Sequence, residues 1–337
     1  MTTTSVLPKV PIEAIANGLH FRLSKNEQWV ALKIEDGTSA SVRVHSLASP
    51  QQAYTLAMPN PIMGIHFSPD TEEVIITQKQ TITYWDFQKD NTTAYDISPF
   101  IDDTFLDHLY DPERKRLFLL KKGQLLTLSL ENESPSILQQ VDARTAYHKK
   151  LFQSSAWVGL LPGVEKPQTY RYVAGPDLWS KDDLSAGQVL AGDFNEARSA
   201  SLAKEEYHLA CAKNANGFNT KLIIHQYFGL EKMIQLEGVN ATNSRLQFLD
   251  QDRILLYYAM HTFYFFDVET GDLLEEIHYH SKSEPEEGWL VDFAVSADES
   301  SIVLLIATNH KDNIPHSFEL VLEKISVAHL HQTNTTT

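Results

Sequence analysis

Three of the 14 histidines, His20, His66 and His108, stand in similar places, just before or within short apolar segments of the chain. Imidazole nitrogens that reach one point from neighbouring strands could ligate a divalent metal ion. Counted back from the first residue of the next apolar run, the three offsets are 9, 8 and 9. Because side chains alternate between the two faces of a strand, His66 is out of register with the other two. We therefore expect structural hydrogen bonds, such as one to a neighbouring loop, rather than a metal site, and we expect no cofactor.

The other reactive residues of the sequence do not form a complete catalytic or metal-binding motif. His278-Tyr-His280 and His329-Leu-His331 could each present two nitrogens on one face of a strand, but outer and terminal positions favour solvated edges. The chain contains no Gly-x-Ser-x-Gly, His-Glu-x-x-His, phosphate-binding glycine loop or dinucleotide fingerprint. Cys211 falls in an apolar run, which is typical of a core residue. No catalytic residue can be named, so the sequence predicts a protein that is not an enzyme.

The charge balance bears on the partner. Lys and Arg number 28 against 44 for Asp and Glu, which gives a formal net charge of −16. Non-specific binding of nucleic acid and of anionic membranes depends on basic patches, so we expect neither as a partner. Acidic connections such as Asp102-Asp103 instead suit a protein with a basic segment. A single cysteine, no signal-peptide pattern and no run of about 18 apolar residues favour the cytoplasm.

One pattern recurs seven times along the chain: a short apolar segment, a polar turn centred on Ser or Asp, and a longer apolar run. Successive turns are 44, 43, 43, 49, 47 and 46 residues apart, and their central residues are Ser24, Ser68, Asp111, Ser154, Ala203, Asp250 and Ser296. A third run with alternating polarity and a fourth, more polar run follow in most units, as expected of half-buried and edge strands. A period in the forties with four strands per unit is the signature of a propeller blade.

The repeats predict an all-β fold, a seven-bladed β-propeller of four-stranded antiparallel blades, with six or eight blades as alternatives. We expect one domain over residues 1–337, with blades at about 18–60, 61–100, 101–143, 144–192, 193–240, 241–284 and 285–330. Residues 1–14 contain a possible closing strand, which Pro8 and Pro11 would restrict to an edge position. Residues 187–204 fit worst, and Asp193 could instead cap a helix there. The innermost strands are predicted to bury Phe21, Phe67, Leu109, Phe248 and Phe293 between blades.

Two segments resemble the WD-repeat family of β-propellers. Residues 67–87 match a whole blade, from Phe67-Ser68-Pro69-Asp70 to Tyr84-Trp85-Asp86-Phe87, and residues 265–273 resemble a third strand with its Thr-Gly turn. The Ser-Pro-Asp and Ser-Ala-Asp turns also resemble TolB-type propeller repeats. Gly-His pairs are absent and the Trp-Asp pair occurs in one of the seven units, so the repeats are degenerate.

The resemblance implies a non-catalytic scaffold that binds another protein through one face of the propeller. Aromatic and Met anchors within a polar rim are typical of binding surfaces. The blade connections supply such residues, which could equally cover the end of the core; the candidates for partner contact are Met58, Met63, Trp179, Asp102 and Asp103. The alternative is a metal-dependent hydrolase or ligand-binding propeller that uses His20, His66 and His108 in its central channel.

Overall fold

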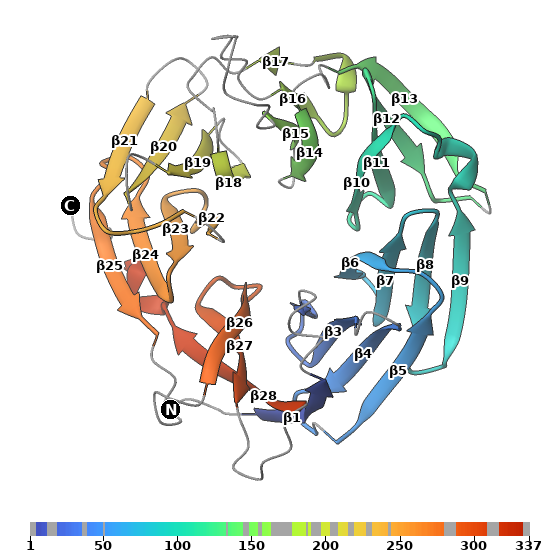
Figure 1. Cartoon of the computed structure of the whole chain (residues 1–337), viewed down its shortest axis with the longest axis horizontal. Helices are drawn as coiled ribbons and strands as arrows, with labels where there is room; N and C mark the ends of the chain where they lie inside the picture. The colour runs from blue at the N-terminus through green and yellow to red at the C-terminus, as the bar shows by residue number, and fades with distance from the viewer. Residues whose placement is uncertain are drawn as a thin grey trace.

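The computed structural model is a ring of seven four-stranded antiparallel sheets (Figure 1). It describes residues 5–11, 19–35, 39–49, 51–132, 134–143, 148–153, 157–162, 177–186, 188–189, 197–202, 208–214, 219–226, 231–241, 244–279, 288–308 and 317–332. In six sheets, four consecutive strands lie side by side, whereas the seventh combines the last three strands with the first strand of the chain. The predicted all-β, seven-bladed propeller is therefore confirmed.

Within each blade, the strands follow one another from the ring axis outward. Blade 1 contains β2 (His20–Leu23), β3 (Trp29–Glu35), β4 (Ala40–Ser46) and β5 (Ala53–Met58). Blade 2 contains β6 (Ile62–Phe67), β7 (Glu73–Gln78), β8 (Thr81–Asp86) and β9 (Asn91–Asp96). Blade 3 contains β10 (Phe105–Asp111), β11 (Arg116–Lys121), β12 (Gln124–Ser129) and β13 (Ser136–Asp142). Blade 4 contains β14 (His148–Gln153), β15 (Trp157–Pro162), β16 (Asp177–Ser180) and β17 (Gln188–Val189).

Blade 5 contains β18 (Ala197–Leu202), β19 (His208–Asn214), β20 (Thr220–Gln226) and β21 (Glu231–Leu236). Blade 6 contains β22 (Arg245–Leu249), β23 (Ile254–Ala259), β24 (Thr262–Asp267) and β25 (Leu273–His278). Blade 7 contains β26 (Gly288–Val295), β27 (Ser301–Thr308), β28 (Ser317–Ser326) and β1 (Ser5–Pro11). The described residues also form three short 3₁₀ helices, η1 (Ser98–Phe100), η2 (Leu184–Ala186) and η3 (Ala328–Gln332). No helix in the described part of the chain could span a bilayer.

The strand bounds can be compared with the blade limits predicted from the repeats. The strands from β2 to β28 all lie within the seven predicted blades, while the single-domain assignment stays a prediction. In the region from 187 to 204, the described residues include the short strand β17 and the strand β18. Asp193, the expected helix cap, lies outside the described residues, as do the turn residues Ser154 and Ala203.

The sheets pack face to face around the ring through apolar side chains. Side chains on the facing surfaces of consecutive blades form apolar clusters in six of the seven gaps, the exception in the described residues being the gap between blades 4 and 5. Phe21, Phe248 and Phe293 are at most 6% exposed, in three different gaps, as predicted. Phe67 and Leu109 are half-buried and pack against two further clusters. Burial of both faces of each sheet therefore requires an unbroken ring.

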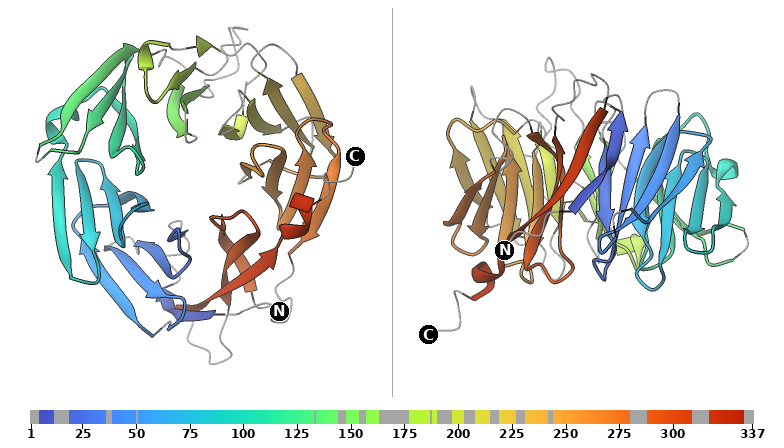
Figure 2. Two further views of the ribbon diagram at one scale, coloured as in Figure 1. Left: turned by 180° about the vertical axis from the view of Figure 1, so that it is seen from behind. Right: turned by 90° about the horizontal axis from the view of Figure 1, so that it is seen from below.

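The ring is closed by hydrogen bonding between the two ends of the chain. Strand β1 pairs antiparallel with β28, from Ser5 opposite Leu322 to Pro11 opposite Ser317. The register is irregular between Leu7 and Val10, the interval that contains Pro8. Proline cannot donate a ladder hydrogen bond, and β1 is the outermost strand of its sheet, where this loss is tolerated. Figure 2 shows the resulting disc from behind and from its edge.

The repeated Ser-to-Asp pattern forms the turns between first and second strands. In blade 7, the Ser296 hydroxyl accepts the Ser301 N–H at 3.0 Å and donates to Asp298 at 2.7 Å. Blade 1 repeats this arrangement, with Ser24 accepting from the N–H of Trp29 and donating to Asn26. Short polar side chains that bond to nearby backbone favour turns, which explains why these positions recur in the sequence.

The two faces of the disc follow from the meander. Turns between first and second strands, and between third and fourth, lie on one side, which we call the lower face. Turns between second and third strands, and the connections from each blade to the next, lie on the opposite side, which we call the upper face (Figure 2).

Two aspartates, the buried Asp292 and the half-buried Asp107, connect neighbouring blades at β-bulges of inner strands. Asp292 accepts the N–H of Phe293 at 2.8 Å and that of Phe21 in blade 1 at 3.1 Å. Asp107 accepts the N–H of His108 at 2.9 Å and that of Leu151 in blade 4 at 2.9 Å. The pairing register shifts immediately before each aspartate. A bulge re-aims a side chain, and here it brings each carboxylate to the backbone of the next blade.

Deletion of residues 1–11 should open the ring. Removing β1 exposes the ladder edge of β28, which pairs with it at five positions. At a net value of roughly 1 kcal/mol per hydrogen bond, we expect the free energy of unfolding to fall by about 4 kcal/mol. Urea unfolding followed by circular dichroism measures this loss, and a synthetic peptide of residues 1–13 should restore part of it. An unchanged unfolding midpoint would contradict closure by β1.

Replacement of Asp292 by Asn should destabilise the fold in a pH-dependent way. Burial alone would raise the pKa of this carboxyl, but His20, Arg245 and the Phe21 N–H together hold the pKa below its ordinary value. The contribution to stability is therefore complete above the unfolded pKa of about 4 and is lost as the pH falls through the lowered folded value. We expect a loss of about 3 kcal/mol at pH 7 because Arg245 and the Phe21 N–H lose their charged partner.

Chemical unfolding of Asp292→Asn and of the unmodified chain at pH 7 and at pH 3 tests this expectation. The difference between the two proteins should narrow at pH 3. Asp103→Asn, at an exposed aspartate, is the matched control and should stay within about 0.5 kcal/mol at both values. A constant difference for Asp292→Asn across the pH range would show that the carboxylate charge does not fasten the blades.

Candidate functional site

The three inner-strand histidines occupy separate surroundings. His20 Nδ1 lies 3.4 Å from the Asp292 carboxylate, and its side chain is 48% exposed. His108 is buried, and its Nε2 lies 3.0 Å from the backbone carbonyl of Gln78 at the end of β7, in the neighbouring blade. Among the described residues, no three His, Cys, Asp or Glu side chains are grouped as metal ligands.

His66 is packed rather than presented. Its ring lies 5.7 Å from that of Tyr110 in blade 3. Burial, and then the nearby charges of Arg22 and His108, lower the pKa of His66 to about 3, so the imidazole is neutral at physiological pH. Gly64 makes room for this ring, since a Cβ there would lie 3.4 Å from His66 Nε2 and 3.0 Å from Thr77 Oγ1.

The two His-x-His pairs are not brought together into a ligand set in the described part of the chain. His278 Nδ1 lies 3.1 Å from the Thr262 hydroxyl, and its Nε2 lies 3.1 Å from Glu276. His329 Nε2 lies 2.7 Å from Glu275. His280 lies outside the described residues, and so does the side chain of His331.

Four of the five residues expected to contact a partner lie at the upper face of blades 1 to 3. Met63 is 43% exposed, whereas Met58 is half-buried against the core between blades 1 and 2. Asp102 and Asp103 are exposed in the connection between β9 and β10. Lys121 and Thr104 bond to Asp102 and lower the pKa of its carboxyl to about 2. Trp179 is 5% exposed, in the core between blades 3 and 4, so we leave it out of the proposed surface.

These upper-face residues belong to one continuous surface. Gln78 donates to the carbonyl of Asn60, in the connection that joins Met58 to Met63. The ammonium of the next residue, Lys79, lies 5.9 Å from the centre of the Phe105 ring. Phe105 itself follows the acidic connection, where Asp102 and Lys121 pair at 2.6 Å. We call this surface the upper patch; it comprises Met58, Met63, Lys79, Asp102, Asp103 and Phe105.

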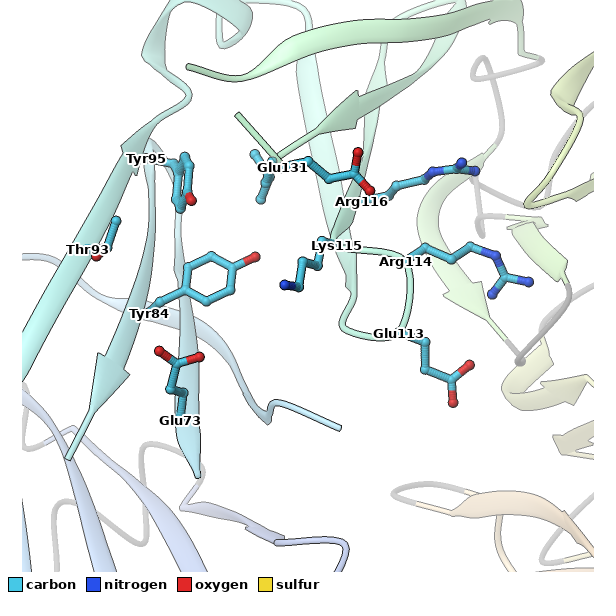
Figure 3. Close-up of a pocket in the computed structure, with 10 residues that line it drawn as sticks. Glu73, Tyr84, Thr93, Tyr95, Glu113, Arg114, Lys115, Arg116 and Glu131 are labelled. Atoms are coloured by element: carbon cyan, nitrogen blue, oxygen red, sulfur yellow. The ribbon is translucent and has the colours of Figure 1, made fainter. Parts of the chain in front are cut away.

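A second feature is a cavity of about 670 Å³ between blades 2 and 3, open toward the lower face. Strands β8 and β9 form one wall, and the turn between β10 and β11 forms the other (Figure 3). Its lining is Glu73, Tyr84, Thr93, Tyr95, Glu113, Arg114, Lys115, Arg116, Leu130 and Glu131. This cavity was not predicted from the sequence, although a run of three basic residues in an acidic chain marks the turn between β10 and β11.

The basic residues of this turn are used differently. Arg114 pairs with Asp111 at 3.3 Å and with Asp182 at 3.0 Å, and Arg116 donates to the carbonyl of Lys181 at 3.0 Å. Both arginines therefore connect blades 3 and 4. Lys115 has a φ of 49°, in the left-handed region, and points toward the Tyr84 hydroxyl while the arginines point away (Figure 3).

Tyr84, which lines the cavity, is hydrogen-bonded to Tyr110 of blade 3. The hydroxyls of Tyr84 and Tyr110 lie 2.5 Å apart, and burial raises the pKa of Tyr84 to about 12. Tyr84 is therefore a neutral phenol at physiological pH. The lining offers one ammonium, guanidinium groups, phenol groups and carboxylates. This arrangement is suited to polar recognition.

Comparison with known proteins adds a relationship in fold. No family model and no curated protein matches the sequence. Among solved structures, U3-55K superposes with a TM-score of 0.60 at 10% sequence identity, over 96% of this chain and 98% of that chain. Hsv2 from Kluyvelomyces marxianus superposes with a TM-score of 0.57 at 10% identity, over 91% and 98%. Similarity at this identity concerns the fold alone, and in fold the chain is a seven-bladed β-propeller, as the repeats predicted.

Proposed function

We propose that the chain is a non-catalytic scaffold that binds a partner protein through its upper face. The observation that carries the proposal is the upper patch, where Met63 is 43% exposed beside the acidic connection of Asp102 and Asp103. A propeller holds such connections on a rigid frame, which reduces the ordering cost of binding. An apolar side chain inside a polar rim is the usual composition of a recognition surface.

The charge of the patch and of the whole chain supports a partner with a basic segment. Asp103 forms no ion pair among the described residues, and the chain carries a net charge of −16. Such charges accelerate encounter with a cationic partner, and their effect is screened by salt. We also propose a cytoplasmic location, which rests on the single cysteine.

A glutamate at Met63 should abolish capture of the partner. Met63→Glu places a charge at the apolar point of the patch, and we expect at least a tenfold loss of the proteins that co-purify with the tagged chain from its native cell. Quantitative mass spectrometry measures the loss. Circular dichroism should show an unchanged fold, since the side chain is exposed.

Met233→Glu is the matched control. Met233 is 64% exposed on the outer strand β21, far in the ring from blade 2, and its replacement should leave capture unchanged. Nuclease treatment of the lysate separates direct protein binding from bridging by nucleic acid. Equal capture by the two variants and the unmodified chain would overturn the upper patch. Release of all proteins by nuclease would overturn the protein partner.

A further inference from the structure

The inner strands of blades 6, 7 and 1 bring exposed basic groups together in an otherwise acidic chain. Arg245 begins β22, and His20 and Arg22 lie on one face of β2. The side chains of Arg245 and His20 are 38% and 48% exposed, and Arg22 is also exposed. The carboxylate they share, Asp292, is fully buried. The groups that solvent reaches here are therefore the basic ones.

The charge of Asp292 is already used within the protein. Its two oxygens accept the backbone N–H groups of Phe21 and Phe293, and they also contact Arg245 and His20. The described hydrogen bonds of Arg245 leave from Nη1, to Asp292 and to the carbonyl of Phe293. Its guanidinium carbon also lies 5.1 Å from the centre of the Phe293 ring, in a cation–π contact. The contacts with Asp292 and Phe293 thus hold Arg245 in place, while part of its side chain stays exposed to solvent.

Arg22 is the less satisfied of the two guanidinium groups. Its Nη1 donates to the carbonyl of Phe21 at 2.9 Å, and no carboxylate in the described residues forms an ion pair with it. Solvent reaches the side chain, but protein encloses it on most sides, and this loss of hydration lowers the pKa of Arg22. Asp292 and Arg245 both act on its charge, which places the three groups in one local field. Two guanidinium groups thus face one carboxylate, an excess of positive charge.

His66 of blade 2 does not add to this positive charge. Arg22 acts on His66, whose imidazole is packed between blades and is neutral at physiological pH. A planar guanidinium offers parallel N–H donors that match the oxygen pairs of phosphate and carboxylate groups. An oxyanion between Arg22 and Arg245 would neutralise the excess charge that the protein leaves uncompensated.

We propose that Arg22, Arg245 and His20, on the inner strands of blades 1 and 6, bind a small multivalent oxyanion at the axis of the ring. The ligand class is a compound with at least two negative charges on phosphate or carboxylate groups. This site shares no residue with the upper patch, so the proposal of oxyanion binding does not depend on the proposed protein partner.

Isothermal titration of the full chain with pyrophosphate, and separately with citrate, tests the site. We expect one saturable site per chain for at least one of the two probes, with affinity falling as salt rises. Arg22→Gln should weaken binding at least tenfold, since a charged hydrogen-bond donor is removed. Lys122→Gln, at an exposed upper-face lysine outside the ring axis, is the matched control and should stay within twofold. Binding of pyrophosphate alone identifies phosphates as the ligand class, and binding of citrate alone identifies carboxylates.

Nuclear magnetic resonance of the unmodified protein keeps the test independent of how the variant folds. The ring signal of His20, assigned with His20→Gln, should shift and saturate during titration with the bound probe. The signal of His329, paired with Glu275 near the outer strand β25, should stay in place. Absence of saturable binding for both probes would overturn the proposal. Equal losses in Arg22→Gln and Lys122→Gln, or a shift of His329 without His20, would overturn it as well.

Discussion

Burial of both faces of every blade is the constraint on which this structure depends. A four-stranded sheet with an apolar surface on each side has no stable form alone, so each blade needs one neighbour before it and one after it. Every blade has a packing partner on both sides only when the last blade contacts the first. Phe21 and Leu305 share a core across that final gap, and the pairing of β1 with β28 joins the two ends of the chain in one sheet.

The packing of blade against blade also explains the polar contacts between neighbouring blades. Where two sheets meet at the inner edge, backbone N–H groups of one blade face the next blade without a strand to accept them. Asp292 and Asp107, which lie at bulges, accept hydrogen bonds from these N–H groups. The free-energy cost of removing a carboxylate from water is offset by several donors at once. Lys181 and Asp111, both almost fully buried and 2.9 Å apart, fasten blades 3 and 4 in a related way. The basic groups around Asp292 carry more positive charge than its one carboxylate balances, and this excess is the reason for proposing a binding site there.

The blades were predictable because their signal is local. A serine or aspartate that bonds within its own turn recurs in blades 1, 3 and 7, and the apolar runs on either side of it recur at a similar spacing. Trp179 shows the limit of this reasoning, because a tryptophan near a connection is equally typical of a surface and of a core. The neighbours of Asp292 and the lining of the cavity could not be found from spacing. Both sites join residues of different blades. Bulges and turns of unequal length also make residue spacing a poor guide to register. His20 and His108 have the same offset in the sequence, but His20 lies opposite Lys33, the fifth residue of β3, and His108 lies opposite Leu119, the fourth residue of β11.

Closure of the ring by the first strand is tested most directly by a cross-link. In a chain with Cys211→Ser, cysteines at Val6 and Val321 would occupy directly opposite positions of β1 and β28, a separation that a disulfide can span. Mild oxidation followed by peptide mapping should join the two segments within one chain. The pair Val6→Cys and Val303→Cys, which are not opposite each other, should stay unlinked. Equal linkage in the two pairs, or none in the first, would contradict a ring closed by β1.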